Sequence, residues 1–275
     1  MHNYFYRWFY LFLLFSLAAF SPPNPAASPS KERSGALIDL ADKAFWSMNY
    51  PKADSIYTSE LSKHDSNAEL YWKMARLQVS IGESIEPGKK AEQLHHYRKA
   101  AEYARTCITL DSTNSKGHTW LAASLGIMAD KIGTKEKLAR AQEIKHELDR
   151  ALQLNPNDET ALSILGSYYH EAANIGWFRR MVANTFIGQI PKGNHELAEN
   201  AFTKAIRIDS RIIRNYHELA LIYIEKGNKE EAIRLMKSAL DKPILLASDR
   251  RRMEEMRTLL KKMSTENESN SESSE

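Results

Sequence analysis

The sequence predicts an all-α fold, a solenoid of about five stacked helix pairs, on three observations. The 275 residues are 43% hydrophobic and include only 11 glycines and 9 prolines, a composition that favours helices. Apolar residues recur at helical spacing in pairs of neighbouring segments. These paired segments then follow one another as a repeat, which is the sequence pattern of a solenoid.

The two clearest repeat units occupy residues 159–243. In each unit a first helix carries large apolar residues around a small one, and a second helix carries alanines at its contact points. Gly227 permits a left-handed turn between the helices of the second unit, and Pro243 closes that unit. This order is that of the tetratricopeptide repeat (TPR), so we expect a TPR-like α-solenoid. The positions are Leu162, Leu165, Gly166, Tyr169, Ala198, Phe202, Ala205 and Ile208, then Tyr216, Leu219, Ala220, Tyr223, Ala232, Leu235 and Ala239.

Three earlier units follow the same scheme, starting near Leu37, Tyr71 and Trp120. Strings typical of helix ends occupy residues 110–114 and 154–158. Three of the five units exceed the usual length of about 34 residues. The extra residues fall at 83–94, 130–137 and 174–193, where we expect long inserts between the helices of a pair. We expect the residues that carry function to lie at these inserts before the repeats themselves.

The two ends of the chain differ from the repeats in composition. Arg7 precedes an apolar run of thirteen residues, so residues 1–21 are predicted to be a signal peptide or an N-terminal anchor. A Pro/Ser-rich linker (22–34), the helical domain (35–263) and an acidic disordered tail (264–275) follow. We therefore expect an exported protein, periplasmic or membrane-associated. Cys107 is the sole cysteine, which excludes an internal disulfide.

The concave face formed by the first helices of the repeats is one candidate site. It combines polar and basic side chains without paired carboxylates, which suits an extended or helical peptide or an acidic ligand. For each residue the alternative interpretation is an ordinary surface position. The candidate residues are His118, Ser163, Ser167, His170, Arg214 and His217.

Two inserts supply further candidates. Lys135 and Lys137 follow a Gly-Thr turn that suits an anion, and the alternative is a solvated turn in which Thr134 caps the next helix. Trp177 and Arg180 belong to a stretch of bulky apolar residues and bases that suits a lipid surface or closure over a groove. The alternative for that stretch is that its aromatic residues fill the gap between two helices.

Patterns of catalysis do not emerge from the sequence. The nine histidines show no metalloprotease spacing, and no glycine-rich nucleotide motif, nucleophile elbow or carboxylate pair is present. We therefore expect no enzymatic activity, no metal site and no cofactor. Basic residues alternate with acidic ones and form no stripe, so we expect no nucleic-acid partner.

A resemblance narrows this further. The order and spacing of several motifs between about residues 100 and 209 resemble the regulator of microtubule dynamics family, of which this chain is expected to be an exported, bacterial relative. The resemblance implies a TPR-like domain without enzymatic activity; animal members are associated with microtubules, and one has a TPR domain linked to phospholipid binding. The motifs are 117–120, 133–137, Ile144-Lys145, 154–158, 164–166, Trp177, Arg180 and Pro191.

Three functions remain open on this basis. The first is a non-enzymatic scaffold or adaptor whose TPR-type groove binds a protein or peptide. The second is a module that binds phospholipid or a membrane surface. The third is a purely structural role in oligomerisation.

Overall fold

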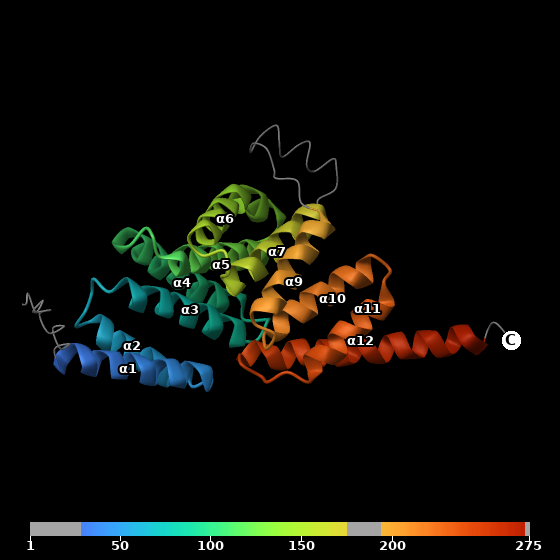
Figure 1. Ribbon diagram of the computed structural model, residues 1–275, viewed down its shortest axis with the longest axis horizontal. Helices are drawn as coiled ribbons and strands as arrows, with labels where there is room; N and C mark the ends of the chain where they lie inside the picture. The colour runs from blue at the N-terminus through green and yellow to red at the C-terminus, as the bar shows by residue number, and fades with distance from the viewer. Residues whose placement is uncertain (1–28, 175–193, 273–275) are drawn as a thin grey trace, which may run out of the picture. The chain divides into compact units, whose positions relative to one another are not determined.

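The computed structural model describes residues 29–174 and 194–272, and these residues form eleven helices and no strand (Figure 1). The chain divides into two units, Met1–Ala36 and Leu37–Glu275, and the first contributes only the start of α1 to the described residues. The helices are α1 (Pro29–Trp46), α2 (Tyr50–Leu61), α3 (Ala68–Ser84), α4 (Lys90–Leu110), α5 (Ser115–Ile132), α6 (Thr134–Leu154), α7 (Glu159–Ala173), α9 (His195–Ile208), α10 (Ile213–Glu225), α11 (Lys229–Leu240) and α12 (Ala247–Glu272).

Successive helices pack in pairs, as the repeat predicts. Helix α3 packs on α4, α5 on α6, α7 on α9, and α10 on α11. The fifth pair, α1 and α2, shares a buried cluster with α3 that includes Phe45, Tyr57 and Leu70. Neighbouring pairs also contact each other through α4 and α5, α6 and α7, and α9 and α10. The predicted all-α solenoid of helix pairs is confirmed.

Asparagine and aspartate residues begin most of these helices. Each accepts a hydrogen bond from a backbone N–H of the first turn, which has no partner within the helix. Two of the caps end the stretches that the sequence marks as helix ends, since Asn114 of 110–114 caps α5 and Asp158 of 154–158 caps α7. The capping residues are Asn49, Asn67, Asn114, Asp158, Asn194 and Asn228.

Small residues stand where helices touch, both within a pair (α7 and α9) and between neighbouring pairs (α4 and α5). A Cβ atom built at Gly166 would lie 2.7 Å from Cε2 of Phe202, a ring with no exposed surface. One at Gly117 would lie 2.9 Å from Sγ of the buried Cys107. Because real Cβ atoms do not approach so closely, α7 and α9 reach their observed separation only with glycine at 166.

The extra residues of two units lengthen helices instead of forming loops. Only residues 85–89 separate α3 from α4, and only Gly133 separates α5 from α6. Gly133 has φ +127°, a conformation that disfavours other residues, and it also stands at the N-cap of α6. The alternative in which Thr134 caps α6 is therefore wrong, because Thr134 is already the first helical residue. The third insert lies mostly outside the described residues.

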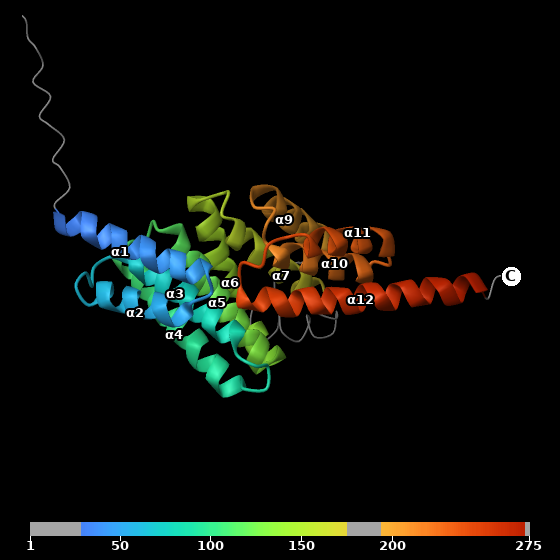
Figure 2. The ribbon, with the colours of Figure 1, turned by 90° about the horizontal axis from the view of Figure 1, so that it is seen from below.

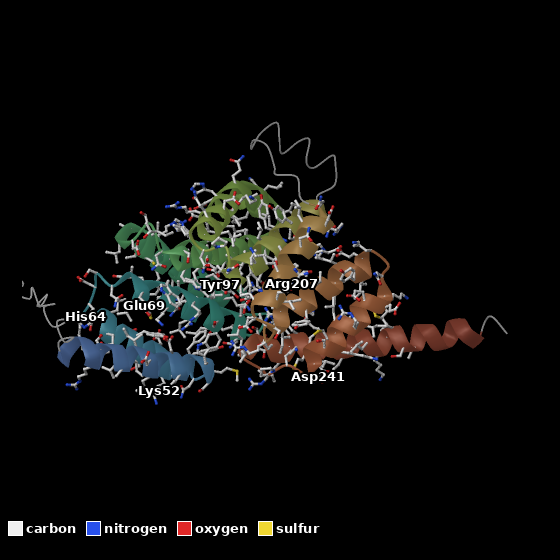
Figure 3. The ribbon with its side chains drawn as sticks, viewed as in Figure 1. Lys52, His64, Glu69, Tyr97, Arg207 and Asp241 are labelled. Atoms are coloured by element: carbon white, nitrogen blue, oxygen red, sulfur yellow. The ribbon has the colours of Figure 1, made fainter. Side chains whose placement is uncertain are left out.

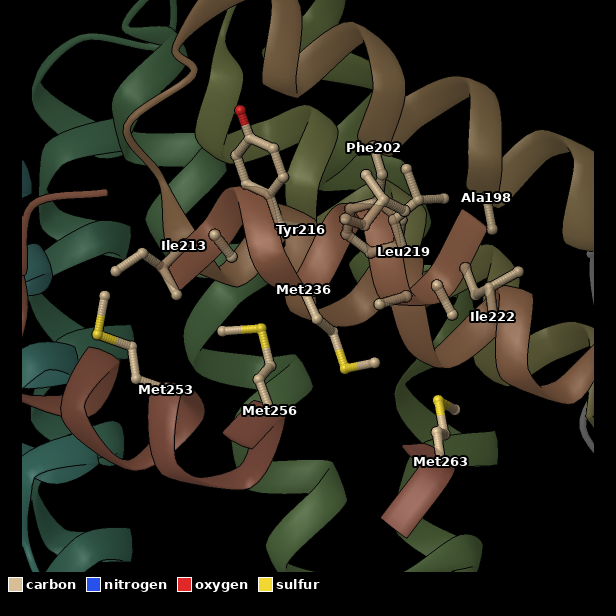
Figure 4. Packing of buried hydrophobic residues seen from close by; sticks show 14 residues of the cluster. Ala198, Phe202, Ile213, Tyr216, Leu219, Ile222, Met236, Met253, Met256 and Met263 are labelled. Carbon is tan, nitrogen blue, oxygen red and sulfur yellow. The ribbon is translucent and has the colours of Figure 1, made fainter. Parts of the chain in front are cut away.

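Helix α12 completes the last core, and the repeat pattern does not predict it as an element of its own. Met253, Met256 and Met263 turn from α12 toward residues of α10 and α11, among them Ile213 and Met236 (Figure 4). The same helix contacts α3, so elements that are far apart in the sequence meet along it (Figures 1 and 2).

The terminal helices extend beyond the predicted domain limits. Helix α1 begins at Pro29, within the stretch assigned to the linker, and α12 continues to Glu272, within the stretch assigned to the tail. Met263 is the last buried residue of α12 among those with described side chains. None of the helices in the described ranges combines the length and apolar character needed to cross a bilayer.

Candidate functional site

A cavity of about 490 Å³ lies among α5, α6 and α7. Apolar side chains supply much of its wall, and further residues come from α3, α4, α10 and α12. A volume of this size suits a small ligand or a short segment of a larger one. The apolar wall residues are Tyr97, Ala123, Ile127, Ala129, Leu138, Ala141, Ile144, Ile164, Tyr168 and Ala172.

Two glycines shape this cavity in different ways. Gly82 on α3 leaves room for the Tyr97 ring, whose Cε1 would lie 2.5 Å from a Cβ built at that glycine. Tyr97 is only 1% exposed and belongs to the interior seen in Figure 3. Gly126 on α5 also lines the cavity, but a Cβ built there meets no atom within 4 Å. The space beside Gly126 is therefore open.

A cluster of arginines and acids from three helices lines part of the cavity. Glu83 of α3 receives hydrogen bonds from Ser248 (3.0 Å) and Arg252 (3.4 Å) of α12. Arg214 of α10 approaches the same carboxylate at 3.9 Å. Burial alone raises the pKa of Glu83, but the positive charges of Arg252 and Arg214 outweigh it and hold that pKa below its usual value. Glu83 is therefore an anion that joins α3 to α12.

A second charged group comes from α5, α6 and α7. Nζ of Lys137 lies 2.9 Å from a carboxylate oxygen of Asp130 and 2.9 Å from one of Glu171. Burial lowers the pKa of Lys137, but the hydrogen bonds to these two acids outweigh it and raise the pKa above its usual value. Lys137 is therefore a paired cation at the cavity wall, and it holds three helices together there.

Two polar atoms at the cavity wall lack a hydrogen-bond partner among the described residues. They are Oε1 of Gln93 and the hydroxyl of Tyr168, and both atoms are buried. Burial raises the pKa of Tyr168 to about 12, so its hydroxyl stays protonated and able to donate. Buried polar groups are nearly always satisfied, so both atoms would gain a partner if a side-chain rotation exposed them to a ligand.

Three of the ten predicted site residues line this cavity: Lys137, Ser167 and Arg214. Ser163 lies directly behind them, 2% exposed, and its Oγ accepts a hydrogen bond from Nε of Arg214 at 3.3 Å. Lys135 is exposed and is not part of the cavity wall. Of the residues predicted for the concave face, Ser163, Ser167 and Arg214 lie together in the structure, because α7 and α10 are neighbours.

The predicted histidines lie elsewhere. His118 is buried between α5 and α6, with Nδ1 2.6 Å from Glu147 and Nε2 3.2 Å from the carbonyl of Ser112. His217 faces α12, with Nε2 3.4 Å from Glu255. His170 pairs with Glu225 near the end of α7. Trp177 and Arg180 lie outside the described residues.

Other wall residues are not among those predicted from the sequence. Arg251 and Arg252 belong to α12, more than a hundred residues after Tyr97 in the chain, and no local pattern links them. Gln93 lies in the stretch expected to be a loop insert, and Tyr97 lies three residues beyond that stretch, so the sequence did not predict that both residues share helix α4. The described wall contains no histidine or cysteine and offers apolar, ionic and hydrogen-bonding contacts.

Comparison with known proteins agrees with the repeat pattern. Regulator of microtubule dynamics protein 1 of Pongo abelii is 28% identical over 206 residues, which are 74% of this chain and 65% of that protein. This chain therefore spans just under two thirds of that relative. The Bos taurus protein is 27% identical over 232 residues (84% and 72%), and the Caenorhabditis elegans protein 24% over 222 residues (81% and 97%).

Solved structures support the fold. A thermophilic TPR protein from Thermus thermophilus superposes with a TM-score of 0.59 at 15% identity, covering 82% of this chain and 99% of that one. At this identity the likeness concerns the fold alone, and it confirms the predicted TPR-like architecture. Residues 37–264, most of the chain, match the family described as Regulator of microtubule dynamics protein 1-3. The chain belongs to that family.

Proposed function

We propose that this protein is a non-enzymatic scaffold that binds a peptide segment of a partner protein in the cavity beside Gly126. The observation that carries the proposal is an open cavity with apolar and charged walls and free space beside Gly126; rotation of Gln93 and Tyr168 would expose to it two atoms that have no hydrogen-bond partner among the described residues. A peptide backbone offers both complementary groups, N–H and C=O. An apolar side chain of the same peptide would occupy the space beside Ile127 and Leu138.

The charged groups refine the expected sequence of the peptide. Arg251 lies at the wall and is about half exposed, with Glu255 at 3.8 Å as its ion-pair partner. Arg214 and Arg252 already share Glu83. An acidic residue flanking the apolar one would therefore find its partner in Arg251, with the charge contributing to orientation and association rate more than to affinity.

Family membership and fold are consistent with this proposal. Helical-repeat proteins present extended concave surfaces that hold partners. The relatives are named as regulators of microtubule dynamics. This chain spans only part of several of them, so a role in microtubule dynamics is only a proposal here.

We also propose that the protein is exported and acts in the periplasm or at a membrane. The support is the apolar run after Arg7 and the Pro/Ser-rich stretch that follows it. Mass spectrometry of the mature N-terminus in a native host tests this proposal. Cleavage near residue 21 is expected, and an intact Met1 on protein released without detergent would contradict both a signal peptide and an anchor.

A phospholipid is the second candidate ligand. The observation that favours it is the half-exposed Arg251 beside the apolar part of the cavity wall, because an amphiphile combines an acidic head group with apolar chains. Trp177 and Arg180, which the sequence suggests for a lipid surface, are the residues expected to contact this ligand. Loss of vesicle binding in Trp177→Ala and Arg180→Ala variants would assign the contact to that insert.

Gly126 offers a direct test of the peptide proposal. A Gly126→Trp variant places an indole ring in the open cavity, while Gly126→Ala is the matched control that leaves most of the space free. Peptides are selected from a random display library on the immobilised full chain, and their affinity for the three proteins is measured by calorimetry. We expect equal binding to wild type and Gly126→Ala and no measurable binding to Gly126→Trp.

The outcomes separate the two ligands. Peptides that bind Gly126→Trp as tightly as wild type would contradict the cavity as their site. If no peptide is selected while anionic vesicles bind wild type and not Gly126→Trp, the ligand is a phospholipid. Failure of both ligands to bind would remove both proposals.

A further inference from the structure

Three helix ends converge next to the cavity described above, and Asn174 lies at the wall of that cavity and contacts this second place. His170 belongs to the last turn of α7, His195 is the first residue of α9, and Glu225 is the last residue of α10. The sequence separates them widely, so spacing rules for metal ligands do not detect them. In sequence the two histidines stand on either side of the long insert.

The side chains of these residues approach one another closely. Nε2 of His170 lies 2.8 Å from Oε2 of Glu225, and the rings of His170 and His195 have centroids 5.7 Å apart. One ligand atom from each of the three residues lies within 4.8 Å of the other two. Asn174 adds a hydrogen bond from its Nδ2 to the same Glu225 oxygen at 3.3 Å.

His195 is not fully satisfied by its described neighbours. Its Nδ1 is buried and has no hydrogen-bond partner among them. An imidazole nitrogen removed from water without a partner is costly and is uncommon in native proteins. The unpaired nitrogen and the nearby anion together make this place suitable for a positively charged ligand.

We propose that His170, His195 and Glu225 bind one divalent transition-metal ion, with zinc as the best match. Two imidazoles and one carboxylate are a known zinc ligand set, which leaves a fourth position for water or another donor. Imidazole nitrogen also suits other late transition metals, whereas calcium and magnesium prefer oxygen ligands. The proposal is independent of the peptide cavity.

The geometry requires only side-chain adjustments. With metal–ligand bonds of about 2.1 Å in a tetrahedron, the ligand atoms lie about 3.4 Å apart. His170 and Glu225 would separate slightly from their present 2.8 Å, while the more distant ligand atoms, now within 4.8 Å, would move closer. Glu225 is 43% exposed, so its side chain has room to move.

The charges and the neighbouring hydrogen bonds are consistent with the site. Two neutral imidazoles and one carboxylate reduce the charge of a divalent ion to a net positive charge of one. The Asn174 hydrogen bond also orients the carboxylate, as hydrogen bonds to the ligands do in zinc sites.

Metal titration of the full chain, purified without a histidine tag and stripped with a chelator, tests the proposal. Zinc is titrated in competition with a chromophoric chelator, and cobalt is used to report coordination through its visible absorption. We expect one zinc ion per chain and an intense cobalt spectrum typical of four-coordination. His195→Ala and Glu225→Gln should each weaken zinc binding about 100-fold or more, since loss of a group that only orients a ligand costs about 10- to 100-fold.

His64→Ala is the matched control, because His64 is exposed in the turn between α2 and α3 (Figure 3). It should bind zinc as wild type does. Glu225→Gln preserves the size of the side chain, and retention of wild-type circular dichroism separates ligand loss from unfolding. In addition, zinc should raise the melting temperature of wild type and His64→Ala but not of Glu225→Gln. No stoichiometric binding, or equal binding by all variants, means an adventitious ion only and overturns the proposal.

Discussion

A methyl group added at Gly126 and one added at Gly166 meet opposite surroundings. Both residues lie inside helices, where alanine is favoured over glycine by about 1 kcal/mol. The Cβ at 126 meets no atom within 4 Å, whereas the Cβ at 166 would lie 2.7 to 2.8 Å from three atoms of the fully buried Phe202 ring. Overpacking of this kind typically costs about 1 to 3 kcal/mol.

We therefore predict that Gly126→Ala is more stable than wild type by about 1 kcal/mol and that Gly166→Ala is less stable by about 1 kcal/mol. Urea unfolding followed by far-ultraviolet circular dichroism measures both values under the same conditions. Equal stabilities for the two variants would contradict the close contact between α7 and Phe202.

Cys107 illustrates a residue whose surroundings were predictable. The repeat places it at a small contact position, and it is fully buried against α5 beside Gly117. Gly126 had no such signal, because the open space beside it is enclosed by residues of α3, α6 and α7 that are distant in sequence. Local patterns thus predict which small residues lie at helix contacts, here between α4 and α5, and they do not predict where packing is left incomplete.

We predict that the Cys107 thiol is unreactive in the folded protein. Burial raises its pKa to about 11, so very little thiolate is present at pH 8, and the side chain is inaccessible. Ellman's reagent should react slowly in buffer and release one equivalent of chromophore quickly in denaturant. A fast reaction in buffer, with the helical signal intact, would show that α4 and α5 separate readily.

At the scale of elements, α12 has a mostly polar sequence that contains one apolar face. Met253, Met256, Leu260 and Met263 follow a three- and four-residue spacing, and all pack on the core of α10 and α11. That spacing was present in the sequence and predicts one buried face. The polar residues around it and the closing acidic stretch obscured it.

The link between α3 and α12 through Glu83 gives a prediction about pH. The pKa of Glu83 is lowered in the folded protein, because the charges of Arg252 and Arg214 outweigh the effect of burial. A lowered pKa stabilises the fold above the unfolded value of about 4.3, and this contribution disappears as pH falls through the folded value. Glu83→Gln removes the charge and leaves Arg252 buried with a weaker partner.

We expect Glu83→Gln to lower the unfolding free energy by about 3 kcal/mol at pH 7, as for a broken buried ion pair. The difference from wild type should narrow as pH falls below about 4. Denaturant unfolding of both proteins at several pH values measures it. Glu92→Gln, at an exposed ion pair of α4, is the control and should change stability by less than about 0.5 kcal/mol. A pH-independent difference would exclude the charge of Glu83 as its origin.

At the scale of the molecule, the helix pairs were predictable from the sequence. The contacts between residues that are far apart in the sequence were not. Each pair is built from residues close in sequence, so periodicity and capping residues predict it. The cavity wall depends on contacts such as Arg252 with Glu83, which are 169 residues apart. The metal-ligand candidates His170, His195 and Glu225 depend in the same way on how two neighbouring pairs, α7 with α9 and α10 with α11, stack. Sequence periodicity carries no information on such distant partners.

Truncation of α12 tests whether the last helix belongs to the cooperative unit. Without residues 247–275 the chain loses three buried methionines and leaves the core of α10 and α11 exposed. Burial of each such side chain contributes about 1.5 to 3 kcal/mol, so we expect a loss of about 5 kcal/mol or more, comparable with the whole stability of many domains. The truncated protein should unfold at much lower urea concentration and bind hydrophobic dyes.

Residues 265–275 follow Met263, the last core residue of α12. Their removal alone should change the free energy of unfolding by less than about 0.5 kcal/mol. If both truncated proteins unfold at the same urea concentration as the full chain, α12 is not part of the folded core.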